Sequence, residues 1–209
     1  SILMFSSSEV YGTPHPNFIP TKEDYIGAIP TRSSRSCYDI GKQVLETLCY
    51  TYYNIHKLPI KVVRPFNFYG KYMGINDNRV LSNWMRNLLK NEDIIVYGDG
   101  KQTRTFCYVE DGIDMCLGVL VKGKNGEVYN VGNPTPELSM NELAETFCNV
   151  LDYKGRNIIK EYPTFYPKDE PLRRCPNIDK VVKDTGTQPK TSLSDGLKFM
   201  LKYFKETEL

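Results

Sequence analysis

Apolar and polar positions follow two different periods along this chain. Residues 2–5 form a short continuous apolar run that stops at serine, as in strands of a sheet covered on both faces. Residues 60–63 (IKVV) predict another strand, which Pro65 stops. Other segments repeat apolar residues every three to four positions, as helices do. Further strands are predicted at 94–97, 105–109, 128–131 and 158–159, and helices at 36–56, 78–90, 111–121, 139–151, 178–184 and 193–204. Because strands and helices alternate, we expect an α/β fold with a mainly parallel sheet.

Composition excludes several classes of function. The 209 residues contain 27 Lys+Arg and 25 Asp+Glu, and the net charge of +2 predicts no surface for nucleic acid or an anionic membrane. No apolar run approaches the roughly 18 residues of a membrane span. The six cysteines lack C-x-x-C spacing and there are two histidines, so we expect neither a metal site nor a disulfide framework, and reduced cysteines are typical of the cytoplasm, where we place the protein.

Tyr38 and Lys42 lie four residues apart in the predicted helix 36–56 and therefore share a face. An ammonium beside a phenol stabilises the phenolate and lowers the pKa of the tyrosine from its usual value of about 10. Such a tyrosine can exchange a proton with a hydroxyl while a hydride moves. A solvated helix face would explain the same spacing, so both interpretations stay open.

Polar residues follow two of the predicted buried strands. Ser7 and Glu9 come after strand 2–5, and Asn67 follows strand 60–63. Open α/β sheets bind ligands at the carboxyl ends of their strands, where these side chains would bind hydroxyl or phosphate groups. Ordinary strand caps and turns would also explain them.

Three segments taken together, 6–12 (SSSEVYG), 38–42 (YDIGK) and 64–70 (RPFNFYG), resemble in order and spacing the extended short-chain dehydrogenases, the family of nucleotide-sugar epimerases, dehydratases and decarboxylases. Further similarity lies at 76–80 (NDNRV), 96–100 (VYGDG), 102–106 (QTRTF), 109–111 (VED), 130–133 (NVGN) and 173–178 (RRCPNI). The resemblance covers essentially the whole chain. It implies the C-terminal part of a Rossmann-like parallel sheet plus a smaller α/β substrate-binding domain, with NAD as cofactor and a nucleotide sugar as substrate.

The resemblance also implies roles for individual residues. Tyr38 would be the catalytic base, Lys42 would hold it and the nicotinamide ribose, Ser7 would supply the family's hydroxyl, and Glu9 its acidic group. Asn67 and Arg104 would grip the diphosphate, a task that suits guanidinium because it forms paired hydrogen bonds. The other implied contacts are Phe66 at the cofactor and Ser8, Asn76, Val80 and Tyr97 at the substrate, with Tyr97 near the nucleotide base.

Arg174 lies in a proline-rich stretch, 162–176, that also carries Asp169 and Glu170 and is expected to be a binding loop. By the resemblance, it matches the arginine that faces the sugar carboxylate in the decarboxylase branch, and is counted with the catalytic and substrate-binding residues. A surface position in the pair Arg173–Arg174 would explain it as well.

Ser8–Glu9 and Arg174 are most similar to the branch that decarboxylates UDP-glucuronate to UDP-xylose by transient oxidation at C4. Dehydratases of deoxythymidine sugars usually carry Asp-Glu at this position, whereas GDP-mannose dehydratases share Ser-Glu. A nucleotide-sugar 4-epimerase or 4,6-dehydratase therefore remains an alternative, as does a truncated module that binds the sugar without catalysis. Lys71–Tyr72 departs from the family's usual Pro-Arg.

The sequence has no G-x-G-x-x-G loop after an early strand, and it starts inside an apolar run. We therefore expect the NAD-binding N-terminal half to lie upstream, and this chain alone to bind NAD poorly and to be inactive. Residues 1–70 are expected to be the remainder of the dinucleotide-binding domain. Residues 71–209 are mainly the substrate-binding domain, with about 105–125 returning to the Rossmann part. The parent protein is expected to form a homodimer through helix 36–56, which this chain, lacking the partner helix, is not expected to do.

Overall fold

A computed structural model describes residues 1–162 and 171–207 of the chain. Its larger sheet consists of β1 (Ile2–Phe5), β2 (Ile60–Pro65) and β7 (Val128–Val131), in the order β1-β2-β7. The strands are parallel, and their register places Met4 beside Val62 and Val63 beside Tyr129. The parallel α/β sheet predicted from the apolar runs is therefore confirmed.

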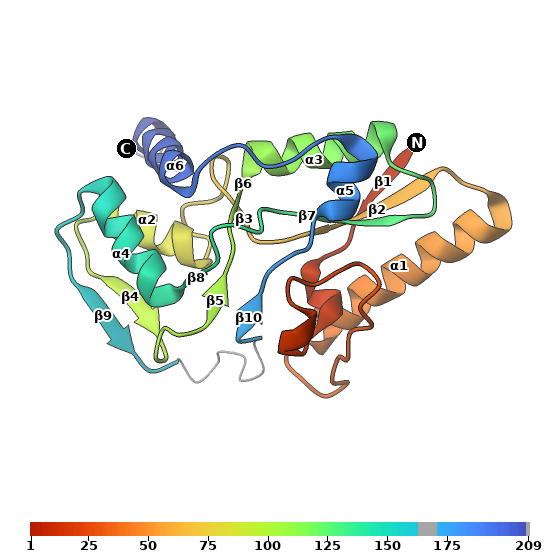
Figure 1. The fold of residues 1–209 in the computed structure, drawn as a ribbon. Coiled ribbons are helices and arrows are strands. Elements are labelled where there is room, and N and C mark those ends of the chain that lie inside the picture. The colour runs from red at the N-terminus through yellow and green to blue at the C-terminus, as the bar shows by residue number, and fades with distance from the viewer. Residues whose placement is uncertain (163–170, 208–209) are drawn as a thin grey trace.

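Helices cover both faces of this sheet, as Figure 1 shows: α1 (Ser36–His56) lies on one side, and α3 (Val109–Lys122) and α5 (Asp179–Thr185) on the other. Side chains of a strand alternate between its faces. Along β2, Ile60 and Val62 pack with Cys49 of α1, whereas Val63 packs with Met115 of α3. The alternation explains why the strand is apolar at consecutive positions.

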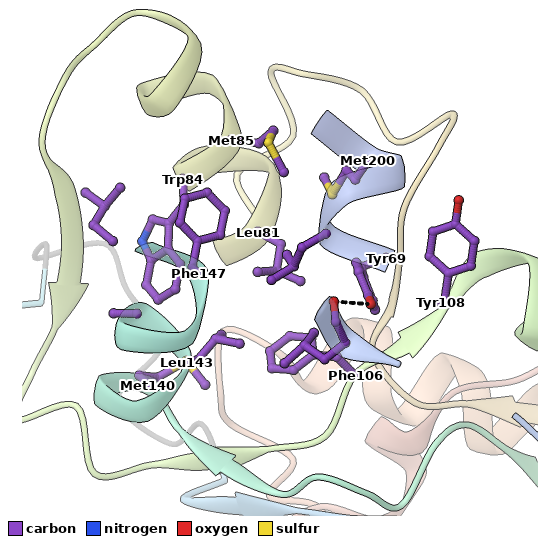
Figure 2. Packing of buried hydrophobic residues seen from close by; sticks show 14 of the residues in the cluster. Tyr69, Leu81, Trp84, Met85, Phe106, Tyr108, Met140, Leu143, Phe147 and Met200 are labelled. Atoms are coloured by element: carbon purple, nitrogen blue, oxygen red, sulfur yellow. Dashed lines mark hydrogen bonds between the residues drawn. The ribbon is translucent and has the colours of Figure 1, made fainter. Parts of the chain in front are cut away.

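A second group of elements has its own core (Figure 2). It contains α2 (Val80–Leu89), β4 (Ile94–Tyr97), α4 (Met140–Leu151), β9 (Asn157–Lys160) and α6 (Leu193–Thr207). Trp84 packs edge-on against Phe147, with ring centroids 5.7 Å apart, and its indole nitrogen donates to the Ile95 carbonyl. Ser139 and Glu142 form a capping box at the start of α4.

Short strands connect these two groups, and of them only β6 (Cys107–Tyr108) lies within a predicted strand. β3 (Phe68–Tyr69) pairs with β6, and β5 (Thr103–Arg104) lies between β8 (Leu138–Ser139) and β10 (Arg173–Arg174). The strand predicted at 105–109 was wrong in its bounds. The chain is interrupted at Thr105, whose carbonyl accepts a hydrogen bond from Asn67 instead of a strand partner, and α3 already begins at Val109.

Two short 3-10 helices, η1 (Ser8–Tyr11) and η2 (Pro16–Phe18), follow β1. Part of the predicted loop 162–176, including Asp169 and Glu170, lies outside the described residues. None of the helices in the described part of the chain is long and apolar enough to cross a membrane. Within residues 1–162 and 171–207, no group of three or more His, Cys, Asp or Glu could hold a metal ion.

Candidate active site

Helix α1 places Tyr38 and Lys42 at the carboxyl end of β1. The Lys42 ammonium lies 5.6 Å from the centroid of the Tyr38 ring and donates a hydrogen bond of 2.8 Å to the carbonyl of Phe5, the last residue of β1. The two side chains therefore share one face of the helix, as their spacing predicts. Tyr38 is 50% exposed, so a ligand can reach its hydroxyl.

The serines after β1 form the turn that carries Glu9. Ser7 is the N-cap of η1, and its hydroxyl accepts a 3.2 Å hydrogen bond from the Glu9 backbone N–H. Ser6, Ser7 and Ser8 are all buried. The strand-cap interpretation of Ser7 is thus correct, and a cap whose hydroxyl still has a proton to donate can also serve a ligand.

Glu9 lies between two arginines. Both terminal nitrogens of Arg174 donate to the two carboxylate oxygens of Glu9, and a nitrogen of Arg35 lies 2.8 Å from one of them. Burial raises the pKa of Glu9, but the charges and hydrogen bonds of Arg174 and Arg35 outweigh it and leave the pKa below its ordinary value. Glu9 is therefore ionised at neutral pH, and its oxygens accept hydrogen bonds but carry no proton to donate.

A cavity of about 430 Å³ opens beside this ion cluster. Of the residues expected at the substrate, it is lined by Asn67, Val80, Tyr97 and Arg104, and Arg35 also reaches it. Asn76 is exposed and is not among the lining residues; the next two residues of its loop take that position.

The cavity is suited to an anion. Helix α2 begins at its wall, and no side chain caps the helix N-terminus at Arg79. The first N–H groups of a helix attract negative charge, and Arg35 and Arg104 add two guanidinium groups to the lining. The lining also holds Asp77, which is paired with Arg79, so the basic groups outnumber the acidic one in a cavity large enough for a nucleotide-sized group.

A buried hydrogen-bond network fixes α1 relative to the strand ends. Glu46, one turn beyond Lys42, accepts hydrogen bonds of 2.8 and 2.6 Å from Arg64 at the end of β2, and another from Ser6. Arg64 also donates to the Tyr11 hydroxyl at 2.6 Å. One carboxylate thus joins the catalytic helix to the ends of both β1 and β2.

Residues 1–132 match the family model described as "NAD dependent epimerase/dehydratase family". This chain belongs to that family. It is 39% identical over 205 residues to UDP-glucuronic acid decarboxylase 3 of Arabidopsis thaliana, covering 98% of this chain and 57% of the relative. It is 37% identical to UDP-glucuronic acid decarboxylase 1 of Danio rerio, covering 97% and 47%. The chain thus spans about half the length of the curated relatives it matches.

Solved structures of the family share the fold. A UDP-glucose 4-epimerase of Thermotoga maritima, solved with UDP-glucose, superposes with a TM-score of 0.87 at 25% identity, covering 99% of this chain and 64% of the other. A UDP-glucuronic acid 4-epimerase of Bacillus cereus, in complex with UDP-glucuronic acid and NAD, gives 0.82 at 26%, covering 98% and 61%. The Rossmann-like architecture expected from the resemblance is confirmed.

NAD is the cofactor of this family. The residues present fit one end of it: an ammonium and a phenol lie side by side at a strand end, and Phe5 takes one of the three N–H donors of Lys42. Phe66 is 1% exposed, and its ring centroid lies 6.1 Å from that of Tyr11. Its side chain is therefore buried, and a contact with the cofactor, which stays a prediction, would involve its backbone.

Two residues of the site were missed by sequence reasoning, Arg35 and Glu46. Both lie on α1 or at its start, one turn before Tyr38 and one turn after Lys42. Helical spacing therefore put them within reach of the same strand ends. Their importance depends on partners that only the folded chain brings close, Glu9 for the arginine and Arg64 for the glutamate.

Proposed function

We propose that this chain carries the substrate-binding and proton-transfer residues of an NAD-dependent enzyme that decarboxylates UDP-glucuronate to UDP-xylose. The observation that carries the proposal is Arg174, a buried guanidinium that holds the carboxylate of Glu9 through two parallel hydrogen bonds. Glu9 is also paired with Arg35, which lies one turn before Tyr38. A guanidinium that binds one carboxylate this way suits another. The names of the curated relatives support the same substrate.

The chemistry needs a ketone at C4 of the sugar. Bound NAD would supply reversible hydride transfer at C4, and a ketone at C4 would lie β to the carboxylate carried by C5. Tyr38, beside the Lys42 ammonium, takes the proton of the C4 hydroxyl and gives it back at the end of the cycle. As CO₂ leaves, its bonding electrons move onto the C4 oxygen, where the hydroxyls of Tyr38 and Ser7 stabilise the enolate.

Arg174 and Glu9 act at the departing carboxylate. Arg174 exchanges the carboxylate of Glu9 for that of the sugar, while Arg35 remains on Glu9 and compensates its charge. Glu9, an ionised carboxylate, orients the water that delivers the proton C5 gains when CO₂ leaves. The diphosphate is held by Asn67, Arg104 and the N-terminus of α2. Tyr97, which lines the same cavity, contacts the nucleobase.

The proposal assigns cofactor binding and substrate binding to different parts of the chain. Residues 1–70 complete the dinucleotide-binding domain, and residues 71–209 mainly bind the substrate, with 105–125 returning to the first part. The exposed apolar residues Val44, Leu48 and Tyr52 recur along α1 and suit helix packing between subunits of the complete enzyme. The isolated chain is expected to be inactive.

Product mass tests the proposed reaction. The 209-residue chain is assayed alone and joined to the part of the Arabidopsis decarboxylase that lies outside the match, each with NAD and UDP-glucuronate. The joined protein is expected to release CO₂ and the isolated chain is not. The same joined protein with Tyr38→Phe is the control for contaminating activity.

Other outcomes would replace the proposal with one of its alternatives. Loss of water from a nucleotide sugar would identify a 4,6-dehydratase, and an unchanged mass with altered retention would identify a 4-epimerase. If the joined protein bound UDP-glucuronate in calorimetry without converting it or any nucleotide sugar of a panel, the chain would be a binding module.

A further inference from the structure

Two buried arginines of the site lie opposite each other on neighbouring strands. β10 pairs with β5 in parallel, and the register places Arg174 beside Arg104. Both residues are less than one-tenth exposed. Residues opposite each other in a sheet project from the same face, and here one guanidinium holds Glu9 while the other lines the cavity.

The preceding residue of each strand projects to the opposite face, and there both meet one carboxylate. Glu137 accepts a 2.6 Å hydrogen bond from the Thr103 hydroxyl and hydrogen bonds of 2.6 and 2.8 Å from Arg173. Glu137 leads into β8, which pairs with the other edge of β5, so that Ser139 lies beside Thr103. One side chain therefore joins all three strands.

The strands need such a link because each of them has two residues. The ladder between β5 and β10 is extended by the hydrogen bond from the Thr103 N–H to the Leu172 carbonyl. Beyond Arg174 the chain leaves β5 and pairs with Thr21 instead, so Glu137 is the side chain that ties β10 to β5. The Arg173 guanidinium lowers the pKa of Glu137, helped by the Thr103 hydroxyl and opposed by burial. The link is therefore ionic as well as hydrogen-bonded.

We propose that Glu137 is a positioning residue that fixes Arg104 and Arg174 in one relative setting. It thereby sets the distance between the diphosphate and the sugar carboxylate that the site accepts. The ligand groups rest on the proposed function, whereas the link between the two arginines does not. Glu137 touches neither group, since it acts from the opposite face of the strands.

A positioning role differs from a stabilising one in what its loss changes. The side chain of Arg173 is 41% exposed and that of Glu137 21%, and ion pairs with this much solvent contribute little to folding stability. Removal of the Glu137 carboxylate should therefore leave the fold intact and loosen the arginine pair.

The ligand-free test is the titration of Glu9, followed by carbon NMR of its carboxyl group in the 209-residue chain. In Glu137→Ala, β10 loses its link to β5, so Arg174 should hold Glu9 less firmly and the pKa of Glu9 should rise. Arg35 stays in place and limits the rise. Glu137→Gln, whose amide oxygen can still accept hydrogen bonds, should restore part of the wild-type value. A folded Glu137→Ala chain with the Glu9 titration of the wild type overturns the proposal.

The matched control is Asp93→Ala. Asp93 holds Arg156 across β4 and β9 through an ion pair of similar form, with side chains 28% and 83% exposed. Its loss should leave the Glu9 titration unchanged. A shift as large as that of Glu137→Ala would show that any surface pair perturbs Glu9, and would overturn the proposal as well.

Ligand binding gives the second readout. UDP offers the diphosphate alone, whereas UDP-glucuronate also offers a carboxylate. Glu137→Ala should therefore lower the affinity for UDP-glucuronate relative to that for UDP by about fivefold or more, the size of a typical coupling between sites. An unchanged ratio overturns the proposal. If the wild-type chain binds neither ligand, the proposed function fails at this step, and the titration of Glu9 still decides the role of Glu137.

Discussion

Arg174 and Glu9 lie 165 positions apart in the sequence, and two nitrogens of the arginine are hydrogen-bonded to the two carboxylate oxygens of the glutamate. Glu9 follows the first strand, and Arg174 belongs to a two-residue strand near the end of the chain. Their side chains are 12% and 7% exposed. Each charge compensates the other where little solvent reaches them. Removal of one would leave the other buried without a counter-charge, which destabilises the folded state.

Glu9→Gln keeps the shape of the side chain and removes its charge. Arg174 and Arg35 then face each other without a carboxylate between them, and we expect the free energy of unfolding to fall by about 3–5 kcal/mol. Urea denaturation measures the change. Asp93→Asn, at the more exposed pair with Arg156, should cost no more than about 1 kcal/mol. Equal losses at both sites would contradict the buried role of Glu9.

The pH dependence of stability gives an independent measure of Glu9. Its pKa in the folded chain lies below the ordinary value of 4.5 because the two arginines outweigh the opposing effect of burial. The carboxylate therefore contributes stability that is fully present above that value and is lost as the pH falls through the folded-state pKa. Unfolding measured from neutral pH downward should show a shallower acid loss in Glu9→Gln than in the wild type. The same slope in both proteins would show that Glu9 is not the group responsible.

Arg174→Lys tests whether the site needs the paired hydrogen bonds of a guanidinium. A lysine keeps the positive charge but presents a single ammonium that cannot match both oxygens of a carboxylate. Loss of one hydrogen bond to a charged group corresponds to roughly a tenfold to hundredfold fall in decarboxylation rate. Arg156→Lys, at an 83% exposed side chain, should leave the rate unchanged. A lysine variant with the full rate would show that the positive charge suffices and that the paired hydrogen bonds of the guanidinium are not needed.

Periodicity explains which elements of the fold could be predicted. The long helix α1 repeats apolar residues at helical spacing, and the strands β1, β4 and β7 are short runs in which apolar residues predominate. The strands β5, β8 and β10 have two residues each and no period at all. These strands are stabilised by the hydrogen bonds of Glu137 and of the Leu172 backbone, and such contacts between distant segments form only in the folded chain.

The candidate site divides in the same way. Tyr38 and Lys42 form a local pair whose spacing alone places them on one face. Arg35 belongs to the site because Glu9 lies next to it in space. In the sequence it stands among equally polar serines, an arginine and a threonine at 31–36, and nothing there distinguishes it. The resemblance to a family supplied Arg174 and Arg104, yet it could not show that their strands lie in register.

Tyr38→Phe separates proton transfer from structure. The phenol is the group that exchanges a proton with the sugar hydroxyl in the proposed reaction, so its removal should lower the rate about 10²–10⁴-fold. Tyr38 is 50% exposed, and a surface change of this size should alter the free energy of unfolding by no more than about 0.5 kcal/mol. Rate measurements on the joined protein, together with urea denaturation, check both statements. A variant that loses stability along with activity would indicate a structural role for the hydroxyl.

The pair of Arg64 and Glu46 should show the opposite behaviour, because both charges are mostly shielded from solvent. Their side chains are 10% and 18% exposed, and Arg64 also donates to the hydroxyl of Tyr11. Burial raises the pKa of Tyr11 to about 12 against the opposing effect of Arg64, so the phenol stays protonated and donates to Asn130 at 2.7 Å. Arg64→Met therefore leaves Glu46 as an uncompensated buried carboxylate.

We expect Arg64→Met to lower the free energy of unfolding by about 3–5 kcal/mol. The double variant Arg64→Met, Glu46→Leu removes both charges, and replacement of a whole buried ion pair by apolar residues is often neutral. It should therefore be more stable than Arg64→Met alone in urea denaturation. If Glu46→Leu instead lowered the free energy of unfolding further, the main contribution of Glu46 would be the hydrogen bond that it accepts from Ser6. The turn at residues 6–8, more than the end of β2, would then hold α1 in place.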